Sequence, residues 1–169
     1  NINPLPEPVI SGNQEVCGTS TETYYSMTND GVTNMWKVLR GDIKGSSTGN
    51  SVDIEWDELG SGVVTLIQTT VDGCVDSIKF NVRINRLPSP DIRGDENVCS
   101  NNFATYETSS QRKMKYQWFV TGGSIIGSST QFEVRVRWSG SGKGSISLTK
   151  TSEAGCEESY SKDVTINPL

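Results

Sequence analysis

The sequence contains no histidine and no long hydrophobic run. Histidine is the commonest general base and the commonest transition-metal ligand, so its absence removes the usual starting point for enzymatic or metal chemistry. No apolar stretch approaches the roughly 18 residues that a membrane-spanning helix needs, and the mean hydropathy of −0.43 is that of a polar chain. The first residues show neither the basic start nor the apolar segment of a signal peptide, and an initiator methionine is missing. We therefore expect no membrane insertion, and we expect the chain to be a piece of a longer protein.

The sequence also lacks an excess of basic residues. It has 15 Lys and Arg against 20 Asp and Glu, which gives a formal net charge of −5. Because a phosphate backbone binds to a basic face, nucleic acid is not expected as a partner. The charge is unevenly distributed, since residues 1–86 hold 6 basic and 11 acidic residues whereas residues 87–169 hold 9 of each. The two halves therefore have surfaces of different sign, which argues against a binding site common to both.

What the sequence does contain is an internal repeat with a period of 82 residues and no gap. Trp36 and Trp118 are separated by this offset, and the run at 45–48 recurs whole at 127–130. The repeat predicts two domains, residues 1–86 and residues 87–169, of a size that can fold alone. Residues 85–90 contain two prolines and are predicted to be a short, semi-rigid linker, so that the two domains form a rod segment. Other repeated positions are Pro6/Pro88, Val16/Val98, Tyr24/Tyr106, Trp56/Trp138, Leu66/Leu148 and Ile84/Ile166.

Each repeat shows the pattern of short strands and none of a helix. In residues 116–121, Tyr116, Trp118 and Val120 alternate with the residues of the opposite face, which is the period of a strand with one buried face. The expected strands are residues 8–11, 21–27, 33–39, 51–56, 63–70 and 75–84, then 91–93, 104–108, 115–121, 132–138, 144–151 and 158–166. Their regular spacing and the turn residues between them predict an all-β protein with two tandem immunoglobulin-like β-sandwiches.

The aromatic residues allow two interpretations, a sandwich core or a platform for stacking sugars. Those that recur within alternating strands are predicted to be core residues, namely Tyr24, Trp36, Tyr106 and Trp118. The other two tryptophans also recur in alternating strands, so the core remains an interpretation for them, but they end strands before glycine-rich turns. The candidates for ligand contact are therefore Trp56, Trp138 and Phe119. Exposure is expected for the aromatic residues that the repeat does not share, Tyr25, Phe103, Phe119 and Tyr160.

Four cysteines occur at identical spacing in the two repeats. Cys17 and Cys74 are 57 positions apart, as are Cys99 and Cys156. This is not the pattern of a zinc site. In a secreted protein it favours one disulfide within each repeat, which would stabilise a small domain by roughly 3–4 kcal/mol. Immunoglobulin topology places the two cysteines of a repeat at opposite ends of the sandwich unless the segment before the second strand runs beside the last strand, and free thiols are the alternative.

Acidic residues are the remaining candidates for chemistry. The adjacent pairs Asp57-Glu58 and Glu157-Glu158 do not recur in the other repeat and are not placed to face one another across a cleft, so we expect neither an enzyme nor a cofactor. Calcium is a further hypothesis, because oxygen donors occur near loops of the first repeat. No EF-hand spacing is present, and solvated turn residues are the alternative for these donors, Asn29, Asp30, Asp42, Asp53, Asp57 and Asp72.

The second repeat carries a long, ordered pattern in residues 92–166, Ile-x-Gly…Val-Cys…Tyr…Tyr-x-Trp-x-Val-x-Gly-Gly-x-Ile…Val-x-Val-x-Trp…Gly-x-Gly…Gly-Cys…Val-x-Ile. This pattern resembles that of the PKD-like domains of Bacteroidetes surface proteins. The first repeat departs from it at Asn34, Leu39 and Arg40. The resemblance implies an immunoglobulin-like sandwich within a large secreted protein, such as an adhesin or the stalk of a multidomain enzyme. It also implies export by the type IX route through a separate C-terminal sorting domain, and it supplies no catalytic residues.

Together these features predict a non-catalytic spacer or stalk segment of an extracellular, cell-surface protein. The expected partners are other domains of the same longer chain, with an extracellular glycan or protein surface as a further candidate. The alternative function is an accessory carbohydrate-binding module of a secreted polysaccharide-degrading enzyme. Exposed coplanar aromatic residues would favour the alternative, whereas buried ones favour the spacer.

Overall fold

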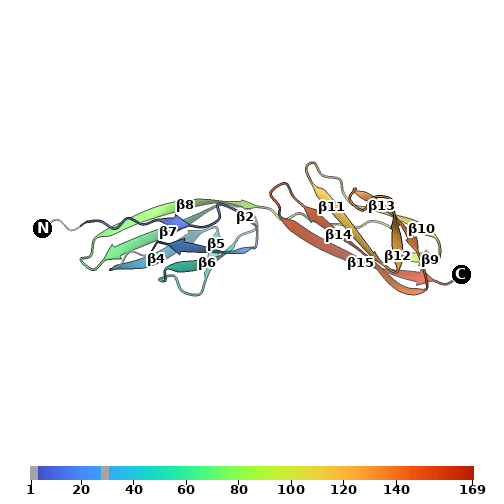
Figure 1. Ribbon diagram of the computed structural model, residues 1–169, viewed down its shortest axis with the longest axis horizontal. Coiled ribbons are helices and arrows are strands. Elements are labelled where there is room, and N and C mark those ends of the chain that lie inside the picture. Colours follow the sequence, from blue (N-terminus) through green and yellow to red (C-terminus); the bar gives the residue numbers. More distant parts are fainter. Residues whose placement is uncertain (1–3, 28–30) are drawn as a thin grey trace. The chain divides into compact units, whose positions relative to one another are not determined.

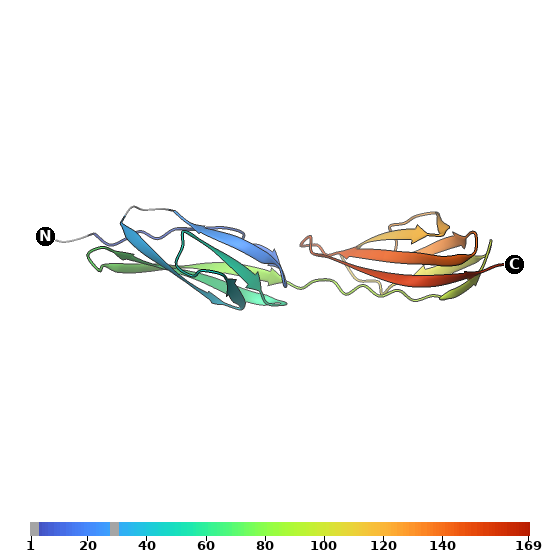
Figure 2. The same cartoon turned by 90° about the horizontal axis from the view of Figure 1, so that it is seen from below.

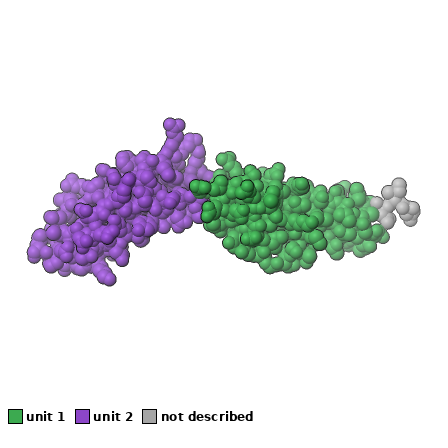
Figure 3. Space-filling view, turned by 180° about the vertical axis from the view of Figure 1, so that it is seen from behind, with its two compact units in different colours: residues 1–86 green, residues 87–169 purple. Residues whose placement is uncertain are grey.

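The computed structural model describes residues 4–27 and 31–169, and the regular elements in these residues are all β-strands (Figures 1 and 2). The chain divides into two compact units, Asn1–Arg86 and Leu87–Leu169, which Figure 3 distinguishes by colour. This is the boundary that the 82-residue repeat predicts. The predicted fold class, two all-β sandwiches in tandem, is confirmed. In the described part of the chain no helix has the length and hydropathy needed to cross a membrane.

Unit 1 is built from two sheets. One has the strand order β1-β3-β6-β5 and the other the order β2-β8-β7-β4. Neighbouring strands are antiparallel, except that β2 runs parallel to β8. The strands are β1 (Ile10–Ser11), β2 (Glu15–Cys17), β3 (Thr21–Ser26), β4 (Val32–Leu39), β5 (Gly41–Lys44), β6 (Ser51–Trp56), β7 (Gly60–Thr70) and β8 (Val75–Asn85).

Unit 2 repeats this arrangement. Its sheets have the orders β10-β13-β12 and β11-β14-β15-β9, and β9 runs parallel to β15 as β2 does to β8. The bridge between Arg93 and Glu107 stands where β1 pairs in unit 1, so the strand predicted at 91–93 is reduced to a single pair. The strands are β9 (Asn97–Cys99), β10 (Phe103–Glu107), β11 (Lys115–Thr121), β12 (Gly123–Ile126), β13 (Glu133–Trp138), β14 (Gly142–Thr151) and β15 (Glu157–Asn167).

Tryptophan forms the centre of each core. Trp36 is 2% exposed and Trp118 is 1% exposed. They lie on β4 and β11, the first or last strand of their sheets, and each is opposite a buried leucine of the neighbouring strand. Each indole also has a polar group that needs a partner when buried. Trp36 donates its Nε1 hydrogen to the carbonyl oxygen of Gly49, and Trp118 donates to that of Gln131, both at 2.8 Å. The predicted burial of the two residues is therefore observed, and the loop that accepts the bond is the same in both units.

The repeated tyrosines, like the two tryptophans, combine a buried ring with a hydrogen bond from their polar group. Tyr24 and Tyr106 are fully buried, yet their hydroxyls donate hydrogen bonds to the carbonyl oxygens of Asn13 (2.9 Å) and Asp95 (2.8 Å). The apolar ring thus fills the core, while the hydroxyl holds the loop that leads into β2 in unit 1 and into β9 in unit 2. Burial raises the pKa of Tyr24 to about 12 against a smaller opposing effect of Trp56, so this hydroxyl stays protonated at neutral pH.

A tight turn follows each tryptophan strand. The residue with left-handed backbone conformation is Arg40 (φ 67°) in unit 1 and Gly122 (φ 84°) in unit 2. The next residue in unit 1, Gly41, begins β5, where a β-carbon would lie 2.9 Å from the carbonyl oxygen of Glu55. Glycine is needed there because two strands approach closely, and not because of its dihedral angle.

Candidate functional site

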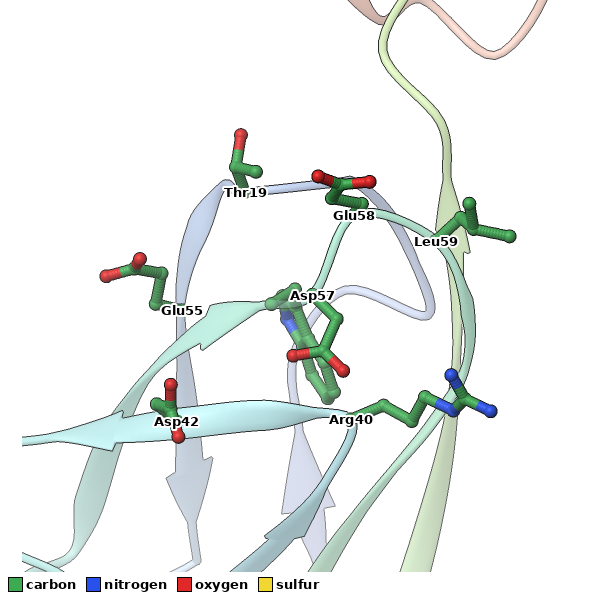
Figure 4. Close-up of a pocket in the computed structure, with 8 residues that line it drawn as sticks. Thr19, Arg40, Asp42, Glu55, Asp57, Glu58 and Leu59 are labelled. Carbon is green, nitrogen blue, oxygen red and sulfur yellow. The ribbon is translucent and has the colours of Figure 1, made fainter.

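An open hollow at one end of unit 1 is lined by several charged side chains (Figure 4). Its volume is about 500 Å³. Arg40 enters from the turn between β4 and β5, and Asp42 from β5. Glu55 and Trp56 come from the end of β6, and the remaining lining residues lie in the flanking loops, Thr19, Asp57, Glu58 and Leu59.

The carboxylates of this hollow do not converge. In Figure 4 the side chains of Glu55 and Glu58 do not point toward one another. Glu55 is moreover engaged by Lys44, whose Nζ lies 2.7 Å from Oε2. Glycoside hydrolysis requires two carboxyl groups that face each other across the bound sugar. The pair Asp57-Glu58 is adjacent in sequence in one loop, and this arrangement does not meet the requirement.

The candidate calcium site does not form among the described donors. In residues 4–27 and 31–169, no group of three or more acidic or cysteine side chains is arranged to hold a metal ion. Asp53 instead accepts a hydrogen bond from Thr23 at 2.6 Å. The sequence shows that these acidic residues lie near loops, but it does not show whether their side chains come together in space. Two of the proposed donors, Asn29 and Asp30, lie outside the described residues.

The candidate stacking residues Trp56 and Trp138 are core residues, which corrects the prediction. They are 2% and 0% exposed. Both end a strand whose side chains alternate strictly between exposed and buried, and the tryptophan falls on the buried face. Trp56 meets the ring of Tyr24 edge to face at 5.9 Å, and the equivalent pair in unit 2 is 6.0 Å apart. The neighbouring glycine-rich turn suggested an open site, but its glycines make room for the indole, because a β-carbon on Gly62 would lie 2.2 Å from Trp56 Cζ3.

The third candidate, Phe119, is 59% exposed. The other aromatic residues that the repeat does not share are exposed to a similar degree, as predicted. Phe119 points away from the core of the β11-β14-β15-β9 sheet. Phe103 lies on the outer face of the other sheet, where the guanidinium carbon of Arg135 is 4.3 Å from its ring centroid. Since these two rings belong to different sheets, they do not form a coplanar platform for a sugar.

The predicted disulfides within each repeat are wrong. The segment before β3 does run beside the last strand, but it runs parallel to it, so Cys17 is opposite Asn85 at the far end of β8. Cys74 precedes Val75 at the near end. The strand between them has 11 residues, so at about 3.3 Å per residue the two cysteines are roughly 36 Å apart, whereas a disulfide needs a Cα separation of about 7 Å or less.

Unit 2 has the same geometry and the same consequence. Cys99 is opposite Asn167 at the end of β15, and Cys156 precedes the first residue of that strand. In the structure Cys17 and Cys156 are disulfide-bonded, whereas Cys74 and Cys99 are free thiols. The sequence shows the equal spacing of the cysteines but does not show the direction in which a three-residue strand pairs.

A buried lysine in unit 2 is the feature that sequence reasoning missed. The side chain of Lys150 has no exposed surface, and its Nζ lies 3.1 Å from Asp91 Oδ1. Nζ also donates to the backbone oxygen of Ser89 (3.3 Å) and to both oxygens of Ser109 (3.3 and 3.2 Å). The sequence pattern could have revealed this burial, because every second residue of β14 faces the core and Lys150 follows the fully buried Ile146 and Leu148 in that series.

Asp91 is held in its charged form by this cluster. Partial burial raises the pKa of its carboxyl, but hydrogen bonds from Ser109, Thr108 and Lys150 outweigh burial and hold the pKa well below its usual range. In unit 1 the position of Lys150 is taken by Gln68, which donates to Ser26 Oγ (3.1 Å) and Asn34 Oδ1 (3.0 Å). The ion pair therefore belongs to unit 2 alone. All of its donors have partners within the fold, so it is a structural pair and not a site poised for a ligand.

A comparison with known protein families finds a match over the second unit. Residues 86–166 match the model of a family described as PKD-like domain. No curated protein matches the chain.

Among solved structures, the chain resembles several immunoglobulin-like and fibronectin-like proteins at low identity. The fibronectin(III)-like modules of CbhA from Clostridium thermocellum match with a TM-score of 0.42 and 12% identity, over 95% of this chain and 95% of that chain. The insect immune protein hemolin matches with a TM-score of 0.45 and 13% identity, over 96% of this chain and 47% of that chain. SGBP-B of the Bacteroides ovatus mixed-linkage glucan utilization locus matches with a TM-score of 0.35 and 13% identity, over 92% of this chain and 43% of that chain. These similarities concern the fold and carry no argument about function.

Proposed function

We propose that the chain is a non-catalytic spacer or stalk segment of a larger extracellular protein, and the match of residues 86–166 to the PKD-like domain model supports this proposal. Its role is structural: to hold another domain of the same longer chain at a distance. A secreted bacterial surface protein, exported by the type IX route, is the setting that the sequence resemblance implies.

One observation carries this proposal: the positions that the two units share serve the core and the turns. All four tryptophans, which are the largest shared side chains, are at most 2% exposed. Where an aromatic residue is exposed, as at Phe119 and Phe103, the other unit has Lys37 and Thr21 at the equivalent position. Selection for a fold preserves the first kind of position, whereas selection for a repeated binding site would preserve the second.

The outer faces of equivalent strands support the same conclusion. On β6 the outward residues include Asp53 and Glu55, and on β13 the equivalent residues are Arg135 and Arg137. A ligand attracted by one face would be repelled by the other. The two units therefore do not present a common charged surface, and a shared ligand is disfavoured.

The cysteine chemistry supports an extracellular setting. Disulfides persist in oxidising compartments and are rare in the reducing cytosol. The bonded state of Cys17 and Cys156 therefore fits a secreted protein. A glycan or protein surface remains a candidate partner for such a segment, but the exposed aromatic side chains do not form the platform that an accessory carbohydrate-binding module needs.

A binding experiment tests the proposal against this alternative. Thermal unfolding of the chain would be followed in the presence of a panel of soluble polysaccharides, because a ligand that binds the folded state raises the melting temperature in proportion to its concentration and affinity. We expect no rise. A concentration-dependent rise that Phe119→Ala abolishes would replace the spacer by a carbohydrate-binding module, and Thr121→Ala on the same outer face of β11 is the matched control.

A further inference from the structure

The four cysteines fall into two structural classes. Cys17 and Cys99 each end the short strand that pairs in parallel with the last strand of their unit, and we term them the short-strand cysteines. Cys74 and Cys156 each follow the turn before that last strand, and we term them the hairpin cysteines. The structure holds one cysteine of each class, Cys17 and Cys156, in the bonded state, and the other of each class, Cys99 and Cys74, as a free thiol.

Each class lies at a defined end of its unit. Cys17 is opposite Asn85, and the amide of Gly18 donates to the carbonyl oxygen of Asn85 at 2.7 Å, so the short-strand cysteine lies where the chain leaves the unit. Cys156 follows β14, whose Lys150 contacts Ser89 near the start of unit 2. The hairpin cysteine therefore lies where the chain enters the unit. In unit 1, too, the turn between β7 and β8 lies at the end where the chain enters (Figure 1).

We propose that a short-strand cysteine of one unit forms its disulfide with a hairpin cysteine of another unit, so that Cys99 and Cys74 are attachment points for further PKD-like units. Pairing inside a unit is excluded because the length of the last strand separates the two classes. The bonded state of Cys17 and Cys156 indicates that both kinds of position are competent to form a disulfide. Cys99 is exposed and Cys74 is half-buried, so both thiols are accessible. The inference goes beyond the proposed spacer role by naming the bond and the partner.

The chemistry of the step is thiol oxidation. The thiols of Cys99 and Cys74 together lose two protons and two electrons as the sulfur–sulfur bond forms. The oxidant is a second disulfide, that of a thiol–disulfide oxidoreductase in the organism or oxidised glutathione in the test tube, and it is reduced to two thiols. In a longer chain the two partners are neighbours, and a short linker would hold them at an effective concentration of about a millimolar.

The test uses two full-length variants that each keep one of the two free thiols. Cys74→Ser retains Cys99, and Cys99→Ser retains Cys74. The variants are incubated separately and together in a glutathione redox buffer, at roughly millimolar protein to match that effective concentration. Products are resolved by non-reducing electrophoresis, and the linked peptides are identified by mass spectrometry. Near-ultraviolet circular dichroism confirms that both variants are folded, and the double variant is the control that forms no cross-link.

The mixture should give the link between Cys99 and Cys74 in about tenfold excess over either symmetric link, which corresponds to a preference of about 1.4 kcal/mol. The unaltered chain, which carries both thiols, should form a ladder of dimers, trimers and longer oligomers. Statistical proportions of the three links, a predominance of Cys99–Cys99, or no cross-link would overturn the proposal. Glycan binding, which would refute the spacer role, leaves this result unaffected.

Discussion

The replacement Trp118→Ala would remove the side chain at the centre of unit 2. The indole is 1% exposed and its Nε1 hydrogen bonds the carbonyl oxygen of Gln131 at 2.8 Å. Truncation leaves a cavity and an unpaired carbonyl, and large-to-small changes of this kind cost about 3–5 kcal/mol. A domain of this size has a total stability of roughly 4–12 kcal/mol. The variant unit should therefore be unfolded or close to it.

Calorimetry of the full chain measures this change. At about 4–8 °C per kcal/mol, the loss corresponds to a fall of roughly 12–40 °C in the melting temperature of unit 2, whereas the transition of unit 1 should be unchanged. Trp36→Ala is the mirror experiment, which should destabilise unit 1 and spare unit 2. Phe119→Ala is the matched control on the same strand, because its side chain is 59% exposed and a surface change of this kind costs about 0.5 kcal/mol or less.

An unchanged melting profile for Trp118→Ala would refute the reasoning about the core. The same is true if the variant stayed folded and lost only the ability to bind a ligand. Equal destabilisation of both transitions would contradict the assignment of each tryptophan to the core of its own unit.

Three further predictions use other parts of the structure. In the native protein a maleimide should modify Cys74 and Cys99 only, and peptide mapping that finds four free thiols or a bond within a unit would contradict the structure. The folded-state pKa of Asp91 is depressed, so the stabilising effect of this carboxylate is complete above the ordinary pKa of about 3.9 and is lost as the pH falls below that value. Asp91→Asn should therefore lower the melting temperature of unit 2 at neutral pH. The variant should also show a smaller decrease in melting temperature between neutral and acidic pH than the unaltered chain. Gly62→Ala should lower the free energy of unfolding of unit 1 by about 1–3 kcal/mol in a denaturant titration, because the added β-carbon would overlap the indole of Trp56. Gly73→Ala is the control, since its β-carbon would meet no atom within 4 Å and the variant carries only the strain of a positive φ.

The longer strands could be predicted from the sequence because their side chains alternate. The predicted ranges 51–56 and 115–121 coincide with β6 and β11, and every other long strand is within three residues of its prediction. The short edge strands β2, β5, β9 and β12 were missed, since three or four residues are too few to show a period. The same shortness hid the parallel direction of β2, and with it the true position of Cys17.

The errors about the candidate site have a common cause. Trp56 was kept as a candidate for ligand contact because of the glycine-rich turn that follows it, but the alternation of β6 places it in the core. Lys150 was assigned to no site, although the same rule places it inside. In both cases the period of the strand was the better guide, and the polar or glycine-rich character of the residue itself was misleading. Convergence of the acidic residues could not be predicted, because it depends on how loops from different strands fold.

The central claim, that the chain is an array of self-contained structural units, is tested most directly by separating them. Residues 1–86 and residues 87–169 would be produced as individual proteins and unfolded with urea while tryptophan fluorescence is recorded. Each has its own buried cluster with two tryptophans, so we predict a single cooperative transition for both, at a stability of roughly 4–12 kcal/mol. If either half were unfolded in isolation, or if its transition were broad and non-cooperative, the account of two independent spacer domains would be contradicted.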